Sequence, residues 1–180
     1  MDKKVLIAFS GGQPAHYILD LLAYVAQQEA SDIGYYLPRP TSLAACAQRA
    51  YVCIGSQTAC KEFLPGEADV LLAMEELEGR RGVRFLSKEG ILILCSCHRL
   101  PMSVAVGTTG YPTDILYRSV SEGRRVLQIK RTEMEIPIIG ATLLRALGYD
   151  APTAQTMLAG CRLTIEDSDL ALVYSKEYSK

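Results

Sequence analysis

Two runs of strand length that are apolar except for Asp69, with a charged segment between them, constrain the fold of this chain most strongly. The runs are Ala68 to Met74 and Ile91 to Cys95, and the stretch Glu75 to Leu86 that joins them is charged and compatible with a helix. Continuous apolar strands are typical of a parallel sheet that is covered on both faces. The order strand, helix, strand therefore predicts a right-handed β-α-β crossover.

The start of the chain predicts a similar strand, turn and helix. Val5 to Phe9 is another apolar run, and Pro14 suits the first turn of a helix, which we expect from about Pro14 to Gln28. With 180 residues, 49% of them hydrophobic, the chain can bury one sizeable core. We therefore predict an α/β fold, a three-layer α/β/α sandwich around a mainly parallel or mixed sheet, with residues 1–180 as a single domain.

The remaining segments complete the expected order of elements. Strands are expected at Ile33–Leu37 and Arg125–Ile129, and helices at Pro137–Leu147 and from Asp150 to Cys161. A loop is expected from Pro101 to Pro112. Three segments stay open at this point: Ala44–Ile54 is extended or partly helical, Thr113–Ser121 is a candidate helix, and the tail Thr164–Lys180 contains "DLALVY", a candidate edge strand.

Charge and composition argue against several classes of partner. Nineteen Lys and Arg stand against twenty Asp and Glu, and no stretch gathers enough basic residues to bind nucleic acid. No apolar run approaches the roughly 20 residues that a bilayer crossing needs. We therefore expect a cytoplasmic protein with no nucleic acid and no membrane among its partners.

Six cysteines, without a C-x-x-C pair, give no pattern for zinc or for an iron-sulfur cluster. We expect reduced thiols, and we interpret the even spacing of Cys46, Cys53 and Cys60 as core packing. A metal site at Cys95, Cys97 and His98 is not favoured, because it would need further ligands and His16 is the only other histidine in the sequence. A Cys-His nucleophile is not favoured either, because adjacent residues of a strand point to opposite faces.

The turn after the first strand is the best candidate for a binding site. It lies at the carboxyl end of a parallel strand and leads into a helix N-terminus, where unpaired N–H groups bind anions. The turn does not match the dinucleotide fingerprint, and it lacks the lysine of a phosphate-binding P-loop. A structural turn with nothing bound is the alternative. The candidate ligand-binding residues are Ser10, Gly11, Gly12 and Gln13.

Glu75 and Glu76 also follow the end of a strand. Acidic residues in the first turn of a helix are stabilised by the helix dipole alone, and we prefer that explanation to a catalytic one. No residue of the chain is therefore predicted to be a catalyst or a metal ligand.

Three segments together resemble one family, the gamma-type subunit of 2-oxoacid:acceptor oxidoreductases, including the beta subunit of indolepyruvate ferredoxin oxidoreductase. "VLIAFSGGQP" is similar to a strand followed by that family's glycine-glycine-glutamine-glycine turn. "LPGEADVLLAMEELEGRRGVRFLSKEGILIL" resembles its strand, helix and second strand in order and spacing, and is the most specific of the three. "IPIIGATLLRALGYDAP" is similar to a helix that ends at a glycine turn. The resemblance covers most of the chain.

The resemblance implies a subunit that contributes interface and coenzyme A contacts to a 2-oxoacid ferredoxin oxidoreductase. The substrate class would be indolepyruvate or a related aryl or branched 2-oxoacid. Thiamine diphosphate and the iron-sulfur clusters would belong to partner subunits, and this chain would hold no tightly bound cofactor. Thiamine diphosphate-dependent subunits are the implied partners, and self-association into a homo-oligomer also stays open.

The chain departs from the family pattern at several positions. Pro14 replaces the last glycine of the turn, Phe9 replaces a glycine before it, and residues 41–43 stand where the family has arginine-glycine-glycine. Loss of these glycines removes the close backbone approach that a phosphate needs. Two alternatives follow: a stand-alone ligand-binding or regulatory domain that has lost catalysis, and a small independent enzyme that uses Cys97 or His98.

Overall fold

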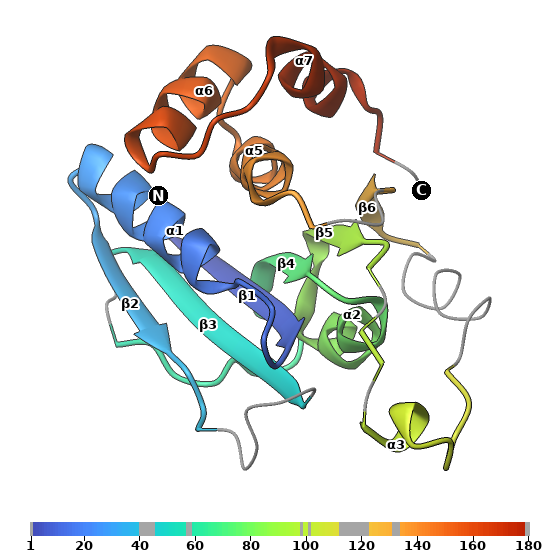
Figure 1. Ribbon diagram of the computed structural model, residues 1–180. Helices are drawn as coiled ribbons and strands as arrows, with labels where there is room; N and C mark the ends of the chain where they lie inside the picture. The colour runs from blue at the N-terminus through green and yellow to red at the C-terminus, as the bar shows by residue number, and fades with distance from the viewer. Residues whose placement is uncertain are drawn as a thin grey trace.

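The computed structural model describes residues 2–39, 46–56, 59–97, 99–100, 102–111, 123–130 and 134–178 (Figure 1). These residues form one six-stranded sheet with the order β2-β3-β1-β4-β5-β6. The strands are β1 (Lys3–Ser10), β2 (Asp32–Tyr36), β3 (Ala47–Gly55), β4 (Ala68–Ala73), β5 (Leu86–Cys95) and β6 (Arg125–Ile129). The helices are α1 (His16–Gln28), α2 (Glu76–Gly82), α3 (Met102–Ala105), α5 (Ile136–Leu147), α6 (Ala151–Gly160) and α7 (Asp167–Ser175), with a 3-10 turn η1 (Val83–Phe85).

The sheet is mixed. Strands β1, β4, β5 and β6 are parallel to one another, with Val5 opposite Val70 and Ile91 opposite Arg125. Strand β3 pairs antiparallel with both β1 and β2. The predicted β-α-β unit is present as β4-α2-β5, and the α/β sandwich is confirmed.

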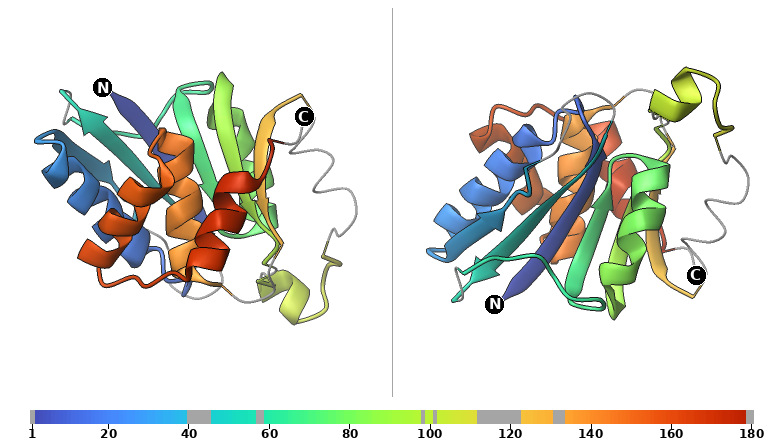
Figure 2. Two further views of the ribbon diagram at one scale, coloured as in Figure 1. Left: turned by 90° about the horizontal axis from the view of Figure 1, so that it is seen from above. Right: turned by 90° about the horizontal axis from the view of Figure 1, so that it is seen from below.

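Helices cover both faces of the sheet (Figure 2). Helices α1, α5, α6 and α7 pack on one face, where Val5, Ile7 and Phe9 of β1 join the larger core. The other face carries α2 and a smaller core that includes Leu6 and Ala8. The alternation along β1 follows from the two-residue period of a strand, and it explains why this strand is apolar throughout.

Sequence signals at their ends account for two of the helices. Pro137 lies in the first turn of α5, and Gly148 ends it with a φ of 103°, as the sequence predicts. Asp150 caps α6 by accepting a hydrogen bond of 3.0 Å from the Thr153 N–H. Among the described residues, none of the helices combines the length and the apolar character of a membrane span.

Three expectations need correction or completion. The described part of Ala44–Ile54 is strand, because β3 forms a full antiparallel ladder with β1. The segment "DLALVY" is not an edge strand but the body of α7, in which Leu170 and Val173, three residues apart, face the core. The expected helix over Glu75–Leu86 ends at Gly82, and β5 begins already at Leu86.

Two further details concern the segments after β5. The expected loop of residues 101–112 contains the short helix α3, which lies beyond the edge of the sheet in Figure 1. The candidate helix at residues 113–121, the residues 41–43 and His98 lie outside the described residues.

Candidate functional site

The candidate site lies where two neighbouring parallel strands send the chain to opposite faces of the sheet. After β1 the chain enters α1, which packs on the larger core. After β4 it enters α2, whose Gly82 packs against Leu71 and Ala8 on the other face. In open α/β sheets, ligands usually bind at the carboxyl ends of two strands whose connections leave in opposite directions.

The four predicted residues meet at this edge. Ser10 ends β1 and is buried, as is Gly11, whose N–H donates a hydrogen bond of 2.8 Å to the Cys46 carbonyl. Gly12 is exposed and has a φ of +86°. The Gln13 N–H donates to the Ser10 carbonyl at 3.0 Å, which closes a tight turn. Among the described residues, the Gly12 N–H has no acceptor.

The Gln13 side chain joins β1 to β4. Its Oε1 accepts a hydrogen bond of 2.6 Å from the Ser10 N–H, and its Nε2 donates to the Met74 carbonyl at 2.9 Å. The same Nε2 lies 4.0 Å from the Cys97 Sγ. Only 8% of Gln13 is exposed, so its carboxamide fills the space between the two strand ends. The sequence indicated Gln13 as a ligand contact, and its present bonds are all internal to the chain.

Arg99 is a component of the site that the sequence analysis missed. Its exposed side chain crosses the turn, and a Cβ at Gly12 would lie only 2.8 Å from the Arg99 Nη2. Glycine is required at position 12 for this contact and for its positive φ. The Gly12 N–H and the Arg99 guanidinium are two donors of the kind that bind phosphate or carboxylate oxygens.

Glu75 forms the wall of the site at the start of α2. The residue is 1% exposed, and its Oε2 accepts a hydrogen bond of 3.0 Å from the Glu78 N–H as the N-cap of the helix. Its Oε1 accepts a hydrogen bond from the Tyr111 hydroxyl. Burial and this bond to Glu75 raise the pKa of Tyr111 above its usual value. The contact fixes the end of the segment that contains α3 to the edge of the sheet.

The helix-dipole interpretation of the acidic pair agrees with the cap that Glu75 makes. Tyr111 could not be assigned from the sequence, because its partner is 36 residues away.

The nearby thiols are not activated. Burial and the charge of Glu75 raise the pKa of Cys97, although Arg99 acts in the opposite direction. Burial raises the pKa of Cys95 to about 12. Both thiols therefore stay protonated at neutral pH, which does not favour a nucleophilic role. In the described part of the chain, no three His, Cys, Asp or Glu side chains converge as metal ligands.

A second buried carboxyl lies one turn further along α2. Glu78 is 3% exposed; its Oε1 pairs with Arg81, and burial raises its pKa. Within the described residues, Glu78 Oε2 and the buried Nε of Arg49 have no hydrogen-bond partner. Five cavities of the described chain are lined by other residues than the Ser10–Gln13 turn.

Comparison with solved structures finds proteins that share this fold. Subunit PORC of the pyruvate oxidoreductase of Thermotoga maritima superposes with a TM-score of 0.59 over 96% of this chain and 90% of its own, at 16% identity. The gamma subunit of a keto/oxoacid ferredoxin oxidoreductase from Geobacter sulfurreducens gives 0.58 over 97% and 91%, at 12% identity. The chain shares the fold of these oxidoreductase subunits.

A third structure places the same fold inside a longer polypeptide. The 2-oxoglutarate:ferredoxin oxidoreductase of Magnetococcus marinus, with 2-oxoglutarate, coenzyme A and succinyl-CoA bound, matches 96% of this chain but only 29% of its own chain, with a TM-score of 0.51 and 14% identity. At these identities the likeness is one of fold. No protein-family model and no curated protein sequence matches the chain.

Proposed function

We propose that this chain is the gamma-type subunit of a 2-oxoacid:ferredoxin oxidoreductase, with thiamine diphosphate-dependent subunits as its partners. The observation that carries this proposal is that the structural match extends over nearly the whole of both chains that are compared. Almost all of this chain corresponds to almost all of two proteins that are themselves subunits of such enzymes. The thiamine chemistry and the iron-sulfur clusters belong to the partner subunits, and this chain provides the interface.

Co-purification tests this function directly. A tagged full-length chain, isolated from its native cell, is expected to bring larger subunits that contain thiamine diphosphate. The genes next to its own provide an independent check, since a neighbouring gene for such a subunit is expected. A chain that is isolated alone, with no such neighbour, would instead support the stand-alone ligand-binding domain.

We also propose that the turn contributes a contact to coenzyme A. Support comes from the unpaired Gly12 N–H beside the exposed Arg99 guanidinium, at the edge of the sheet where α/β proteins bind ligands. The Magnetococcus marinus enzyme with the same fold was solved with coenzyme A bound. Gly11 and Gln13 have internal hydrogen bonds, so Gly12 and Arg99 are the donors that remain for a phosphate.

Calorimetric titration with coenzyme A tests this contact in the reconstituted complex. Arg99→Gln removes one charged hydrogen-bond donor and is expected to weaken binding by about tenfold or more. Arg80→Gln, an exposed arginine on α2, is the matched control and is expected to leave the affinity unchanged. Equal affinity in both variants would contradict a role for Arg99.

For the assembly we propose indolepyruvate or a related aryl or branched 2-oxoacid as substrate. The support is the sequence resemblance of the segment "LPGEADVLLAMEELEGRRGVRFLSKEGILIL". The purified complex is expected to reduce ferredoxin faster with indolepyruvate than with pyruvate or 2-oxoglutarate. The opposite order would assign another substrate and leave the subunit role intact.

A further inference from the structure

Two cysteines lie together on the α2 face of the sheet, away from the turn. Cys53 is in β3, and Cys60 is in the irregular segment that leads to β4. Both pack against the smaller core. The Cys60 thiol donates a hydrogen bond of 3.1 Å to the Tyr51 carbonyl, and Tyr51 and Cys53 project from the same face of their strand. A side-chain hydrogen bond also joins the Cys60 thiol to the Cys53 thiol, so the two sulfur atoms are neighbours.

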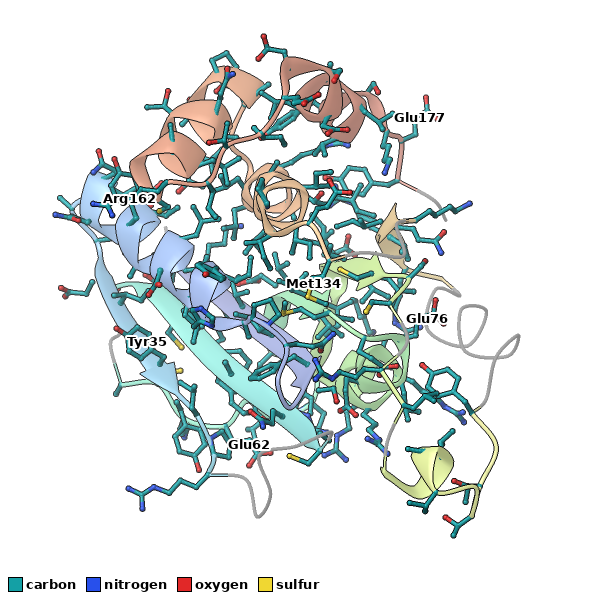
Figure 3. The ribbon with its side chains drawn as sticks, in the orientation of Figure 1. Tyr35, Glu62, Glu76, Met134, Arg162 and Glu177 are labelled. Carbon is teal, nitrogen blue, oxygen red and sulfur yellow. The ribbon has the colours of Figure 1, made fainter. Side chains whose placement is uncertain are left out.

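Further contacts hold the Cys60 segment against β3. The Tyr51 hydroxyl donates to Glu62 Oε1 at 3.1 Å, and the Phe63 ring meets the Tyr51 ring edge-on at 5.1 Å. Figure 3 shows Glu62 beside β3. The position of Cys60 relative to the strand is thus fixed by its neighbours on both sides.

A cavity gives access to Cys53. Its volume is about 190 Å³, and its lining includes Cys53, Phe63 and three lysines, Lys3, Lys4 and Lys61. Lys4 pairs with Glu67 at 3.2 Å. The lining also includes the carboxylates of Asp2 and Glu67, so the three lysines outnumber the acidic side chains by one and the cavity carries a small excess of positive charge. Positive charge at the mouth of a cavity raises the local concentration of anions.

We propose that Cys53 and Cys60 form a reversible disulfide by exchange with an anionic low-molecular-mass disulfide that enters this cavity. The Cys53 sulfur attacks one sulfur of the small disulfide, whose S–S bond breaks; one small thiol leaves with the Cys53 proton. The Cys60 sulfur then attacks the Cys53 sulfur of the mixed disulfide, and the second small thiol leaves with the Cys60 proton. Two protein thiols are oxidised by two electrons, and one small disulfide is reduced to two thiols.

The surroundings of the two thiols indicate which of them reacts first. Burial and the neighbouring Cys53 thiol raise the pKa of Cys60 to about 12, so Cys60 stays protonated in the reduced protein. Cys53, which lines the cavity, is the sulfur that reacts first. The mixed disulfide removes the Cys53 thiol, which is one cause of the raised pKa of Cys60, and this change favours the second step.

Mass mapping of the purified full-length chain tests the proposal with oxidised glutathione as the probe. Trypsin cleaves after Arg49 and after Lys61, and the peptide of residues 50–61 that it releases contains both cysteines. After oxidation this peptide is expected to lose two hydrogen atoms, and reduced glutathione is expected to restore it. The disulfide closes a short loop and is expected to raise the melting temperature by about 5 °C.

Single substitutions separate the two steps. Cys60→Ser is expected to accumulate one glutathionyl group on Cys53, and Cys53→Ser is expected to leave Cys60 unmodified. Cys161→Ser, a half-buried cysteine elsewhere, is the matched control and should react as the unmodified chain does. The unmodified chain itself decides the proposal: a peptide that remains fully reduced, or carries two glutathionyl groups, overturns it.

The charge of the probe tests the role of the lysines. Oxidised glutathione is anionic, whereas cystamine is cationic, so oxidised glutathione is expected to react at least several-fold faster at low salt. The difference is expected to disappear at high salt, because ions screen the lysines. Faster reaction with cystamine at low salt would overturn the anionic preference.

Discussion

At the scale of single residues, Glu75 depends on very few donors. Its carboxylate is almost completely buried, and its described hydrogen bonds come from the Glu78 N–H and the Tyr111 hydroxyl. A buried charge that loses a donor keeps its full desolvation cost. The tyrosine therefore stabilises both the carboxylate and the attachment of the segment that precedes it.

Tyr111→Phe is expected to lower the free energy of unfolding by about 1.5–3 kcal/mol, because a hydrogen bond to a buried charge is lost. Urea unfolding measures this change. Tyr35→Phe is the matched control, because Tyr35 is 54% exposed on β2 (Figure 3). This substitution should change the free energy of unfolding by no more than about 0.5 kcal/mol. Equal stabilities for the two variants would show that the Tyr111 contact does not stabilise the fold.

Glu78 is expected to make the protein less stable as the pH rises. Burial raises its pKa in the folded state above the ordinary 4.5, while Arg81 and Arg49 oppose the shift and Glu75 adds to it. The folded state then binds the proton more tightly than the unfolded state, so this contribution is complete below about pH 4.5 and is lost as the pH rises through the folded pKa. Glu78→Gln cannot titrate. The stability of the unmodified chain relative to this variant should fall between pH 4 and pH 7, and a rise would contradict the prediction.

The sequence predicted the turn after β1, but not the side chains that surround it in the structure. A glycine pair after an apolar strand was enough to predict a turn at the carboxyl edge of the sheet. Arg99 and Tyr111 come from a segment without a regular pattern, and their contacts depend on tertiary structure. The bonds of Gln13 to Ser10 and Met74 could not be predicted, since one partner lies 61 residues away.

At the scale of elements, α2 approaches the sheet unusually closely. A Cβ at Gly79 would lie 2.8 Å from the Ala73 Cβ, an atom that cannot move without its strand. Glycine therefore sets the distance between α2 and β4, and with it the position of the Glu75 cap.

Gly79→Ala is expected to destabilise the fold by about 1 kcal/mol or more, because the clash outweighs the better helix propensity of alanine. Gly110→Ala is the matched control, since a Cβ there meets no atom of the described residues within 4 Å, and its free energy of unfolding should change by no more than about 0.5 kcal/mol. Chemical denaturation compares the two. An unchanged or raised stability for Gly79→Ala would mean that α2 can move away at no cost.

Helices and strands could be predicted from the sequence where the spacing of apolar residues fitted only one type of element. The apolar runs gave β1, β4 and β5. Helical spacing gave α1, although that helix begins at His16 and not at the expected Pro14, and helical spacing with end signals gave α5. The error at α7 arose because a short apolar stretch fits either state, and the choice was made by packing on α5 and α6 together with Asp167 and Asp169 in the first turn. The type of β3 was decided by its pairing with β1 and β2, which is not local information.

At the scale of the whole molecule, one sheet runs through the described chain and both cores rest on it. Calorimetry is therefore expected to show a single unfolding transition, with a calorimetric enthalpy equal to the van't Hoff enthalpy. Two separate transitions would contradict the single domain that the length and composition predict.

The Gln13 side chain also limits the rate at which a molecule can bind at the edge of the sheet. Because both ends of its carboxamide are engaged, a molecule can occupy the space between β1 and β4 only after that side chain has rotated away. Rotation is a first-order step, so the association rate of any occupant would reach a plateau at high concentration. The frequency of this opening, and not the speed of diffusion, would then limit how fast the edge is filled.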